Sequence, residues 1–212
     1  MADNYLEKKF EQYHENKGNV QKKVVNNLSL NSLLLKNRSY RGYDSSYIVS
    51  KEELLKIADV ATKVPSAKNQ QALRFKLVTS EQADKVLKNI KWGGALPELN
   101  LPFPGTEPNA FIIICSTVPE NKWIGVDLGI VSQSMLLKSV EMGLNGICIG
   151  ALNKAEITKE FNLQYEPLLI LAIGKGAENI QIIPIGEDEN HNYYRKDGVH
   201  FVPKVKLEDL VL

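Results

Sequence analysis

Two short polar segments carry residue types that suit an anionic, hydrogen-bonding ligand. The first is residues 38–41, Arg-Ser-Tyr-Arg, which places two guanidinium groups and a serine hydroxyl close together. Guanidinium groups donate paired hydrogen bonds to phosphate or carboxylate, and a hydroxyl can add another. The segment is therefore a candidate anion site, although a solvated helix end could have the same composition.

The second segment is residues 65–71, Pro-Ser-Ala-Lys-Asn-Gln-Gln, which follows an apolar, helix-like stretch. The proline ends that stretch, the serine offers a hydroxyl, and the carboxamides can both donate and accept hydrogen bonds. Together the two segments would suit a ligand that bears a phosphate and amide groups. Taken alone, the second one is also compatible with an ordinary turn.

Other kinds of chemistry lack a signal in the sequence. The three histidines, His14, His191 and His200, lie in terminal polar segments without companions at metal-ligand spacing. There is no Gly-x-Ser-x-Gly elbow for a nucleophile, and the turn at residues 174–176 is too short for a phosphate-binding P-loop. We therefore expect neither a metal site nor a protein nucleophile.

Composition predicts one soluble domain that acts on a small molecule. The chain has 212 residues, 43% of them hydrophobic, and its 26 Lys and Arg nearly balance its 25 Asp and Glu. This balance gives no overall field to recruit nucleic acid or an anionic membrane. The polar first twenty residues and the lack of a long apolar run favour a cytoplasmic protein. Cys115 and Cys148 lie in apolar runs and are expected to be buried free thiols.

The two polar segments flank a predicted helix. Ser50 and Glu53 match a capping box, and the helical spacing of apolar residues after them predicts a helix over residues 51–63. Alternating polar and apolar residues then predict a strand over residues 74–79, and a short helix runs from Ser80 toward Ile90.

The middle of the chain is predicted to be mixed α and β. Three continuous apolar runs indicate strands buried on both faces, over residues 111–115, 147–149 and 168–173. A helix over about residues 126–142, apolar around much of its circumference, lies between the first two strands. A shorter helix, capped by Asn153, continues to Phe161.

Three further segments are less regular. Residues 92–108 are rich in Gly and Pro and predict either a functional surface loop, such as a lid, or a disordered excursion. Residues 1–30 are expected to form a helical extension, with an amphipathic helix over residues 24–35 that packs on the body. The tail over residues 186–212 has no core of its own and is expected to pack on a partner subunit.

The order of these features resembles the nitroreductase family. An Arg-Ser-x-Arg element, a helix, and then Pro-Ser-Ala-x-Asn-x-Gln leading into a strand are similar to that family's FMN-binding layout, although Asn37-Arg38 stands where an arginine pair is usual. The similarity continues from Leu34 to residues 202–210. It implies a single domain over residues 1–212 with an α+β fold, a central mostly antiparallel sheet flanked by helices, and an intertwined homodimer that binds two FMN molecules between its subunits.

The same resemblance implies roles for individual residues. Arg38, Ser39 and Lys204 would hold the phosphate and ribityl end of FMN, Arg41 would lie beside the pyrimidine side of the ring, and Asn69 would approach its N5 and O4 edge. Other residues would flank the ring or face it through the backbone. The full set of expected cofactor-binding residues is Arg38, Ser39, Tyr40, Arg41, Pro65, Ser66, Ala67, Asn69, Gln71, Ile149, Gly150, Ala151 and Lys204.

The implied function is ping-pong electron transfer. NADH or NADPH would give hydride to flavin N5, and a nitroaromatic, a quinone or a similar flat acceptor would then take the electrons. No catalytic residue of the protein itself is expected. A specialised family reaction, such as reductive dehalogenation, enone reduction or flavin fragmentation, is an alternative. A flavin-binding protein without turnover is another, and the physiological acceptor and the preferred nicotinamide are left open.

Overall fold

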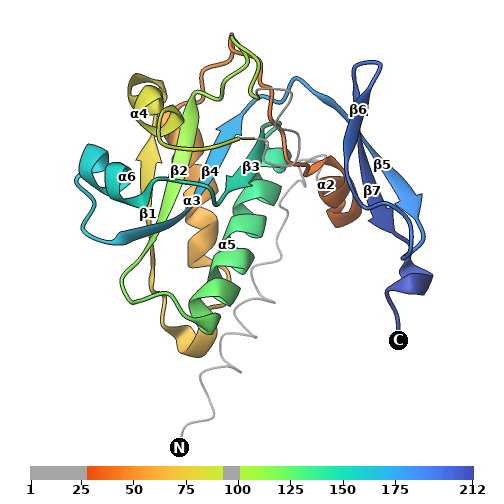
Figure 1. Ribbon diagram of the computed structural model, residues 1–212. Helices are drawn as coiled ribbons and strands as arrows, with labels where there is room; N and C mark the ends of the chain where they lie inside the picture. Colours follow the sequence, from red (N-terminus) through yellow and green to blue (C-terminus); the bar gives the residue numbers. More distant parts are fainter. Residues whose placement is uncertain (1–27, 93–100) are drawn as a thin grey trace, which may run out of the picture.

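The computed structural model describes residues 28–92 and 101–212, and within these ranges a four-stranded sheet lies between two layers of helices (Figure 1). Every neighbouring pair of strands in this sheet is antiparallel. The expected α+β fold with a central antiparallel sheet is confirmed. In spatial order the strands are β1 (Leu73–Val78), β2 (Ala110–Ser116), β4 (Glu166–Gly174) and β3 (Asn145–Ile149).

Helices cover both faces of this main sheet. One face packs against α3 (Lys51–Ala58) and the long α5 (Lys122–Glu141). The other packs against α4 (Ala83–Leu87) and α6 (Lys154–Phe161). The central strand β2 is buried along its whole length because its alternate side chains enter the two cores. This explains why its sequence is continuously apolar rather than alternating.

The predicted capping box sets the start of α3. The Ser50 hydroxyl accepts a hydrogen bond from the Glu53 N–H at 3.2 Å, and the Glu53 carboxylate accepts one from the Ser50 N–H at 2.8 Å. Two N–H groups at the helix end are thereby satisfied. After Ala58 the chain tightens into the 3₁₀ turn η1 (Asp59–Thr62), so the helix predicted over residues 51–63 is confirmed with a narrower last turn.

The long helix α5 begins four residues earlier than predicted. The Asn121 side chain accepts hydrogen bonds from the N–H groups of Trp123 and Ile124 and caps the helix. The prediction of residues 126–142 located the helix but not its start, because the apolar pattern begins after the cap. The helix predicted from Ser80 is shorter than expected and consists of η3 (Ser80–Gln82) followed by α4.

The tail forms a second sheet that the sequence did not predict. Strand β5 (Asn179–Ile185) pairs in parallel with β7 (Val199–Val205), and β6 (Tyr194–Lys196) pairs antiparallel with β7. Asp197 and Gly198, both at positive φ, make the turn between β6 and β7. Figure 1 shows this tail sheet standing apart from the main sheet, ahead of the final turn η5 (Leu207–Asp209). Within the tail, β6 pairs with β7, and β7 in turn pairs with β5, which precedes the tail. Packing of the tail on a partner subunit stays a prediction.

Two of the three irregular segments lie partly outside the described residues. Residues 28–36 contain helix α2 (Leu30–Lys36), whereas residues 1–27 of the expected N-terminal extension are not described. No residue of α2 is buried, although Asn37 after it donates a hydrogen bond to Gln133 of α5 at 3.2 Å. In the predicted loop, residues 101–108 form neither helix nor strand, and residues 93–100 lie outside the description. Among the helices that the structure describes, none has the length and apolar character needed to span a bilayer.

Candidate functional site

Residues 38–41 run along the outer edge of β3. The Tyr40 N–H donates a hydrogen bond to the Gly146 carbonyl at 3.2 Å, and Ser39 forms an isolated parallel bridge with Gly146. A Cβ atom on Gly146 would lie 2.6 Å from the Ala172 carbonyl oxygen and 2.7 Å from the Leu136 side chain. Glycine therefore lets the strand and α5 approach closely. The segment is packed on the sheet edge and is not a solvated helix end.

A cavity of about 310 Å³ lies beside this segment, and we call it the arginine pocket. It brings together four of the expected cofactor-binding residues, which the chain supplies from its N-terminal segment and from β7. Its lining includes Arg38, Ser39, Arg41, Cys148, His200 and Lys204.

The charge in the arginine pocket is positive. Its lining includes Arg38, Arg41 and Lys204 and, within the described part of the chain, no carboxylate. Arg38 donates to the Leu34 carbonyl at 2.7 Å and Arg41 to the Ser39 carbonyl at 3.1 Å, yet the buried Nε of each arginine has no hydrogen-bond partner among the described residues. Burial lowers the pKa of Arg38. Buried donors of this kind favour binding of an anion.

Glu178 ties the tail sheet to this pocket. Its carboxylate accepts hydrogen bonds from the N–H groups of Arg41 and of Gly42, the latter at 3.2 Å, and forms an ion pair with Arg195 of β6. The Arg41 guanidinium lies 5.0 Å from the centre of the Tyr193 ring. Backbone and side chain of Arg41 are thus held by two residues that directly precede strands β5 and β6, Glu178 and Tyr193. Neither Glu178 nor Tyr193 was among the residues expected from the sequence.

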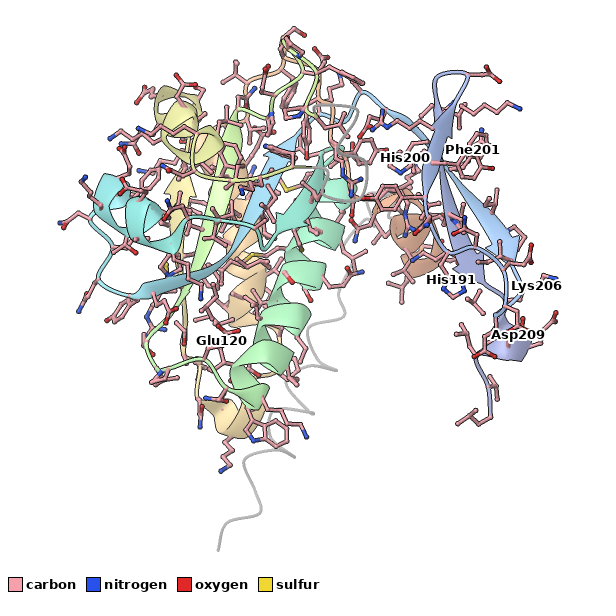
Figure 2. The ribbon with its side chains drawn as sticks, viewed as in Figure 1. Glu120, His191, His200, Phe201, Lys206 and Asp209 are labelled. Atoms are coloured by element: carbon pink, nitrogen blue, oxygen red, sulfur yellow. The ribbon has the colours of Figure 1, made fainter. Side chains whose placement is uncertain are left out.

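His200 is the buried histidine of the pocket. Figure 2 shows His200 and Phe201 on opposite faces of β7, as strand alternation requires, and His200 shares its face with Lys204. The His200 side chain is 2% exposed, and its Nδ1 has no hydrogen-bond partner among the described residues. Burial lowers the pKa of His200, and the nearby Arg195 and Arg41 lower it further, partly opposed by Glu178. Sequence reasoning grouped His200 with the solvated histidines and missed it.

The expectation of two buried thiols is half right. Cys115 is buried in the core on the α4 and α6 side of the main sheet, and this burial raises its pKa to about 11. Cys148 is free but exposed, so that prediction is wrong. It lies on the edge strand β3, where alternation turns its side chain away from the core and into the arginine pocket.

A second cavity, of about 390 Å³, contains the other polar segment, and we call it the amide pocket. Its lining includes the expected residues Pro65, Ser66, Asn69 and Gln71, together with Arg74 and Asp127. The Ser66 hydroxyl accepts a hydrogen bond from the Gln71 N–H at 3.1 Å, and Oδ1 of the Asn69 side chain accepts one from the Gln71 carboxamide, also at 3.1 Å. The segment is thus a folded loop rather than an extended linker, and it contains the 3₁₀ turn η2 (Ala67–Asn69).

The loop rests on a buried acid that sequence reasoning missed. One oxygen of Asp127, Oδ1, accepts a hydrogen bond from the Ala67 N–H at 2.8 Å. Asp127 is 2% exposed, and its second oxygen has no hydrogen-bond partner within the described residues. A lone carboxylate in the apolar part of a long helix was the available signal, because a buried charge needs a partner.

The remaining expected residues line neither pocket. Tyr40 packs its ring against Gly176, and Ile149 is buried in the core toward α4 and α6. Gly150 and Ala151 are exposed after β3, and a Cβ atom added to Gly150 would meet nothing within 4 Å. The Ile149 side chain therefore faces away from both pockets, and any part it plays in ligand binding must use its backbone.

Comparisons with known proteins agree with one another. The Nitroreductase family model matches residues 34–175. The chain is 26% identical over 178 residues to YdgI of Bacillus subtilis, whose name makes it a candidate NAD(P)H nitroreductase, and the match covers 66% of this chain and 85% of the relative. A solved nitroreductase family protein from Clostridium difficile 630 is 27% identical, with a TM-score of 0.54, over 69% of this chain and 83% of that one. A candidate nitroreductase from Exiguobacterium sibiricum 255-15, solved in complex with FMN, is 22% identical, with a TM-score of 0.59, over 71% and 90%.

Proposed function

Because the chain belongs to the nitroreductase family, we propose that it is an FMN-dependent NAD(P)H oxidoreductase of the cytoplasm that reduces nitroaromatics, quinones or similar flat acceptors. The observation that carries this proposal is the arginine pocket, in which three cationic side chains converge without a carboxylate among the described residues. The solved relative that holds FMN and the relative named for NAD(P)H support the choice of cofactor and donor.

The arginine pocket fits the phosphate end of FMN. The unpartnered Nε atoms of Arg38 and Arg41 are donors that a phosphate group would satisfy, and Ser39 and Lys204 add a hydroxyl and an ammonium group to the same cavity. Arg38 and Ser39 would hold the phosphate and ribityl end, with Lys204 as a further cation. Arg41 would lie beside the ring, where a positive charge stabilises negative charge that develops on reduction.

The amide pocket fits the ring end of FMN. Isoalloxazine has both donors and acceptors along one edge, and the carboxamides of Asn69 and Gln71 and the hydroxyl of Ser66 can serve both kinds. Bound FMN would supply the hydride transfer between a nicotinamide and an acceptor. The chain's own residues would bind and orient it, which agrees with the absence of a nucleophile motif from the sequence.

We also propose that two copies of the chain complete each site. The arginine pocket and the amide pocket are separate cavities in one chain and share no lining residue. Leu30, Leu34 and Leu35 of α2 and the final residues from Leu207 onward expose large apolar side chains. A second copy that covered these surfaces could bring one arginine pocket to the amide pocket of its partner, with the C-terminal segment packed across the interface.

The proposal is tested by flavin binding and reduction. The visible spectrum of the purified protein is recorded with FMN, before and after anaerobic addition of NADPH and, separately, NADH. Flavin bands that bleach with either donor support the oxidoreductase. Bands that persist with both would indicate a flavin binder without turnover, and no binding of FMN would overturn the proposal.

A substitution sharpens this test. Lys204→Gln should weaken FMN binding about tenfold or more, because hydrogen bonds to charged groups contribute roughly 1.5–3 kcal/mol. Riboflavin, which lacks the phosphate, should bind the variant and the unmodified chain equally. Lys206→Gln is the matched control, because Lys206 is also exposed, lies two positions further on and does not line the pocket. Equal losses for FMN and riboflavin would argue against a phosphate at Lys204.

A further inference from the structure

We propose that Asp127 is a positioning residue that holds residues 66–71 in a strained conformation and thereby orients Asn69 in the amide pocket. The consequence for the flavin rests on the function proposed above. The effect of Asp127 on the loop does not rest on that function, and it can be measured in the protein without flavin.

The loop adopts a backbone conformation that its residues disfavour. Lys68, Asn69 and Gln71 have φ values of 52°, 54° and 47°, in the left-handed region. Side chains other than that of glycine are crowded there, and asparagine tolerates it best. Three such residues within one short loop need surroundings that impose the conformation, and strained backbone of this kind is concentrated at functional sites.

Contacts within the loop cannot fix its position. The hydrogen bonds from Gln71 to Ser66 and to Asn69, and the one from the Asn69 N–H to the Ser66 carbonyl at 3.0 Å, begin and end inside the segment. They shape the loop but would move with it. Its place relative to the main sheet and α5 must come from contacts that leave the segment.

Two such contacts hold the loop at its two ends. At the far end Arg74 of β1 donates to the Gln71 carbonyl at 2.8 Å. At the near end the Ala67 N–H donates to Asp127 Oδ1 at 2.8 Å, which ties the loop to the long helix α5. Ala67 directly precedes the left-handed pair Lys68 and Asn69, so this bond fixes the chain where the strain begins.

The chemistry of Asp127 indicates more than packing. It is 2% exposed in a helix whose buried positions are otherwise apolar or serine, and only one of its oxygens has a partner among the described residues. A buried carboxylate that is incompletely hydrogen-bonded is costly, and an apolar side chain would fill the same space at less cost. A strained loop that needs a side-chain oxygen to accept from one N–H explains why a polar residue stands at this buried position.

Hydrogen exchange in the flavin-free full chain tests the first step. Asp127→Ala should speed exchange of the Ala67 amide and of the loop amides after it about threefold to tenfold, the range expected for one lost hydrogen bond. Asp127→Asn keeps a carbonyl oxygen at the same place and should restore slow exchange. Ser139→Ala is the matched control, because Ser139 is buried on the same helix and donates only to the Met135 carbonyl, at 3.0 Å.

Three results of the exchange experiment would overturn the proposal. Unchanged loop exchange in Asp127→Ala would overturn the proposal, as would an Asp127→Asn variant that exchanges as fast as Asp127→Ala. Faster exchange of the loop in Ser139→Ala would also overturn it, because the effect would then be a general loosening of α5. If Asp127→Ala does not fold, Asp127→Leu replaces it, since leucine fills the space without an acceptor.

Flavin affinity tests the second step. Because Asn69 is assigned to the ring and not to the phosphate, Asp127→Ala should weaken FMN and riboflavin by the same factor, with Asp127→Asn restoring both. A loss confined to FMN, or no loss despite a loosened loop, would overturn the link between Asp127 and the ring. If the unmodified chain binds neither flavin, the proposed function fails, whereas the exchange experiment still decides whether Asp127 positions the loop.

Discussion

At the scale of single residues, the arginine pocket combines groups that titrate with groups that do not. Arginine stays protonated at any physiological pH even when burial lowers its pKa, as it does for Arg38. His200 lines the same cavity and has a depressed pKa. The charges of the two arginines are therefore constant with pH, whereas His200 takes up a proton when the solution becomes acidic.

His200 should make the fold sensitive to acid. The unfolded chain takes up a proton near the ordinary histidine pKa of about 6.5, whereas burial and the neighbouring arginines hold the folded-state pKa lower. As the pH falls through that window, the unfolded chain binds more protons than the folded chain, so the free energy of unfolding falls. His200→Gln should reduce this acid sensitivity in urea unfolding at about pH 7, 6 and 5.

His191→Gln provides the control for that experiment, because His191 is exposed. It should leave the pH dependence unchanged. An identical dependence in His200→Gln and in the unmodified chain would show that His200 is protonated equally in the folded and unfolded states.

The residues of the two pockets differed in how well the sequence predicted them. Clusters of neighbouring polar residues, such as residues 38–41 and 65–71, were visible, and Lys204 came from the resemblance to a family. Asp127 and Glu178 were not found, because their roles depend on backbone N–H groups far away in sequence. The amino-acid sequence does not show which backbone N–H groups lack a hydrogen-bond partner in the folded chain.

At the scale of secondary structure, the edge of β3 depends on one glycine. Gly146 lies where α5, β4 and residues 38–41 converge, and an added Cβ atom would collide with a backbone oxygen that cannot rotate away. Gly146→Ala should lower the free energy of unfolding by about 1–3 kcal/mol, as overpacking of a core does. Thermal or urea unfolding of the flavin-free chain measures this.

Gly125→Ala serves as the comparison. Gly125 lies within α5, and a Cβ atom there would meet nothing within 4 Å. Alanine favours a helix over glycine by about 1 kcal/mol, so this variant should be slightly more stable than the unmodified chain. If the two substitutions changed the free energy of unfolding equally, the close approach of neighbouring atoms to Gly146 would be contradicted.

Elements were predicted well where their signal was local. The capping box of α3 and the continuous apolar run of β2 depend on neighbours in sequence, and both predictions are confirmed. The strands of the tail sheet were missed because Pro184 and Pro203 interrupt β5 and β7, and β6 has only three residues. Their pairing is set by the turn at Asp197 and Gly198 and by the anchor at Glu178.

At the scale of the whole molecule, the apolar surface of one chain is incompletely covered. Leu30 and Leu34, one helical turn apart on α2, are 63% and 40% exposed, and Leu210 near the C-terminus is 65% exposed. Apolar groups gathered at such sites are typical of surfaces that another protein covers. This is the physical reason to expect a dimer, which the resemblance to the family implied independently.

A charged substitution on α2 should therefore break the assembly. We expect the unmodified chain to have the mass of a dimer in light scattering, and Leu34→Glu to shift it to a monomer with weaker FMN binding. Leu55→Glu is the control, because Leu55 is a similarly exposed leucine on α3 and outside both α2 and the tail. A monomeric mass for the unmodified chain, or a dimeric Leu34→Glu that binds FMN normally, would contradict the proposed arrangement.

The arginine pocket and the amide pocket share no lining residue, so one substitution can destroy either and spare the other. If each copy in a dimer supplies one pocket to each flavin, alleles damaged at Lys204 and at Asn69 disable opposite halves of the site. A cell that expresses both alleles would assemble mixed dimers in which one site carries both lesions and the other carries neither. Two recessive alleles of this gene would then complement each other, each mixed dimer keeping one working site.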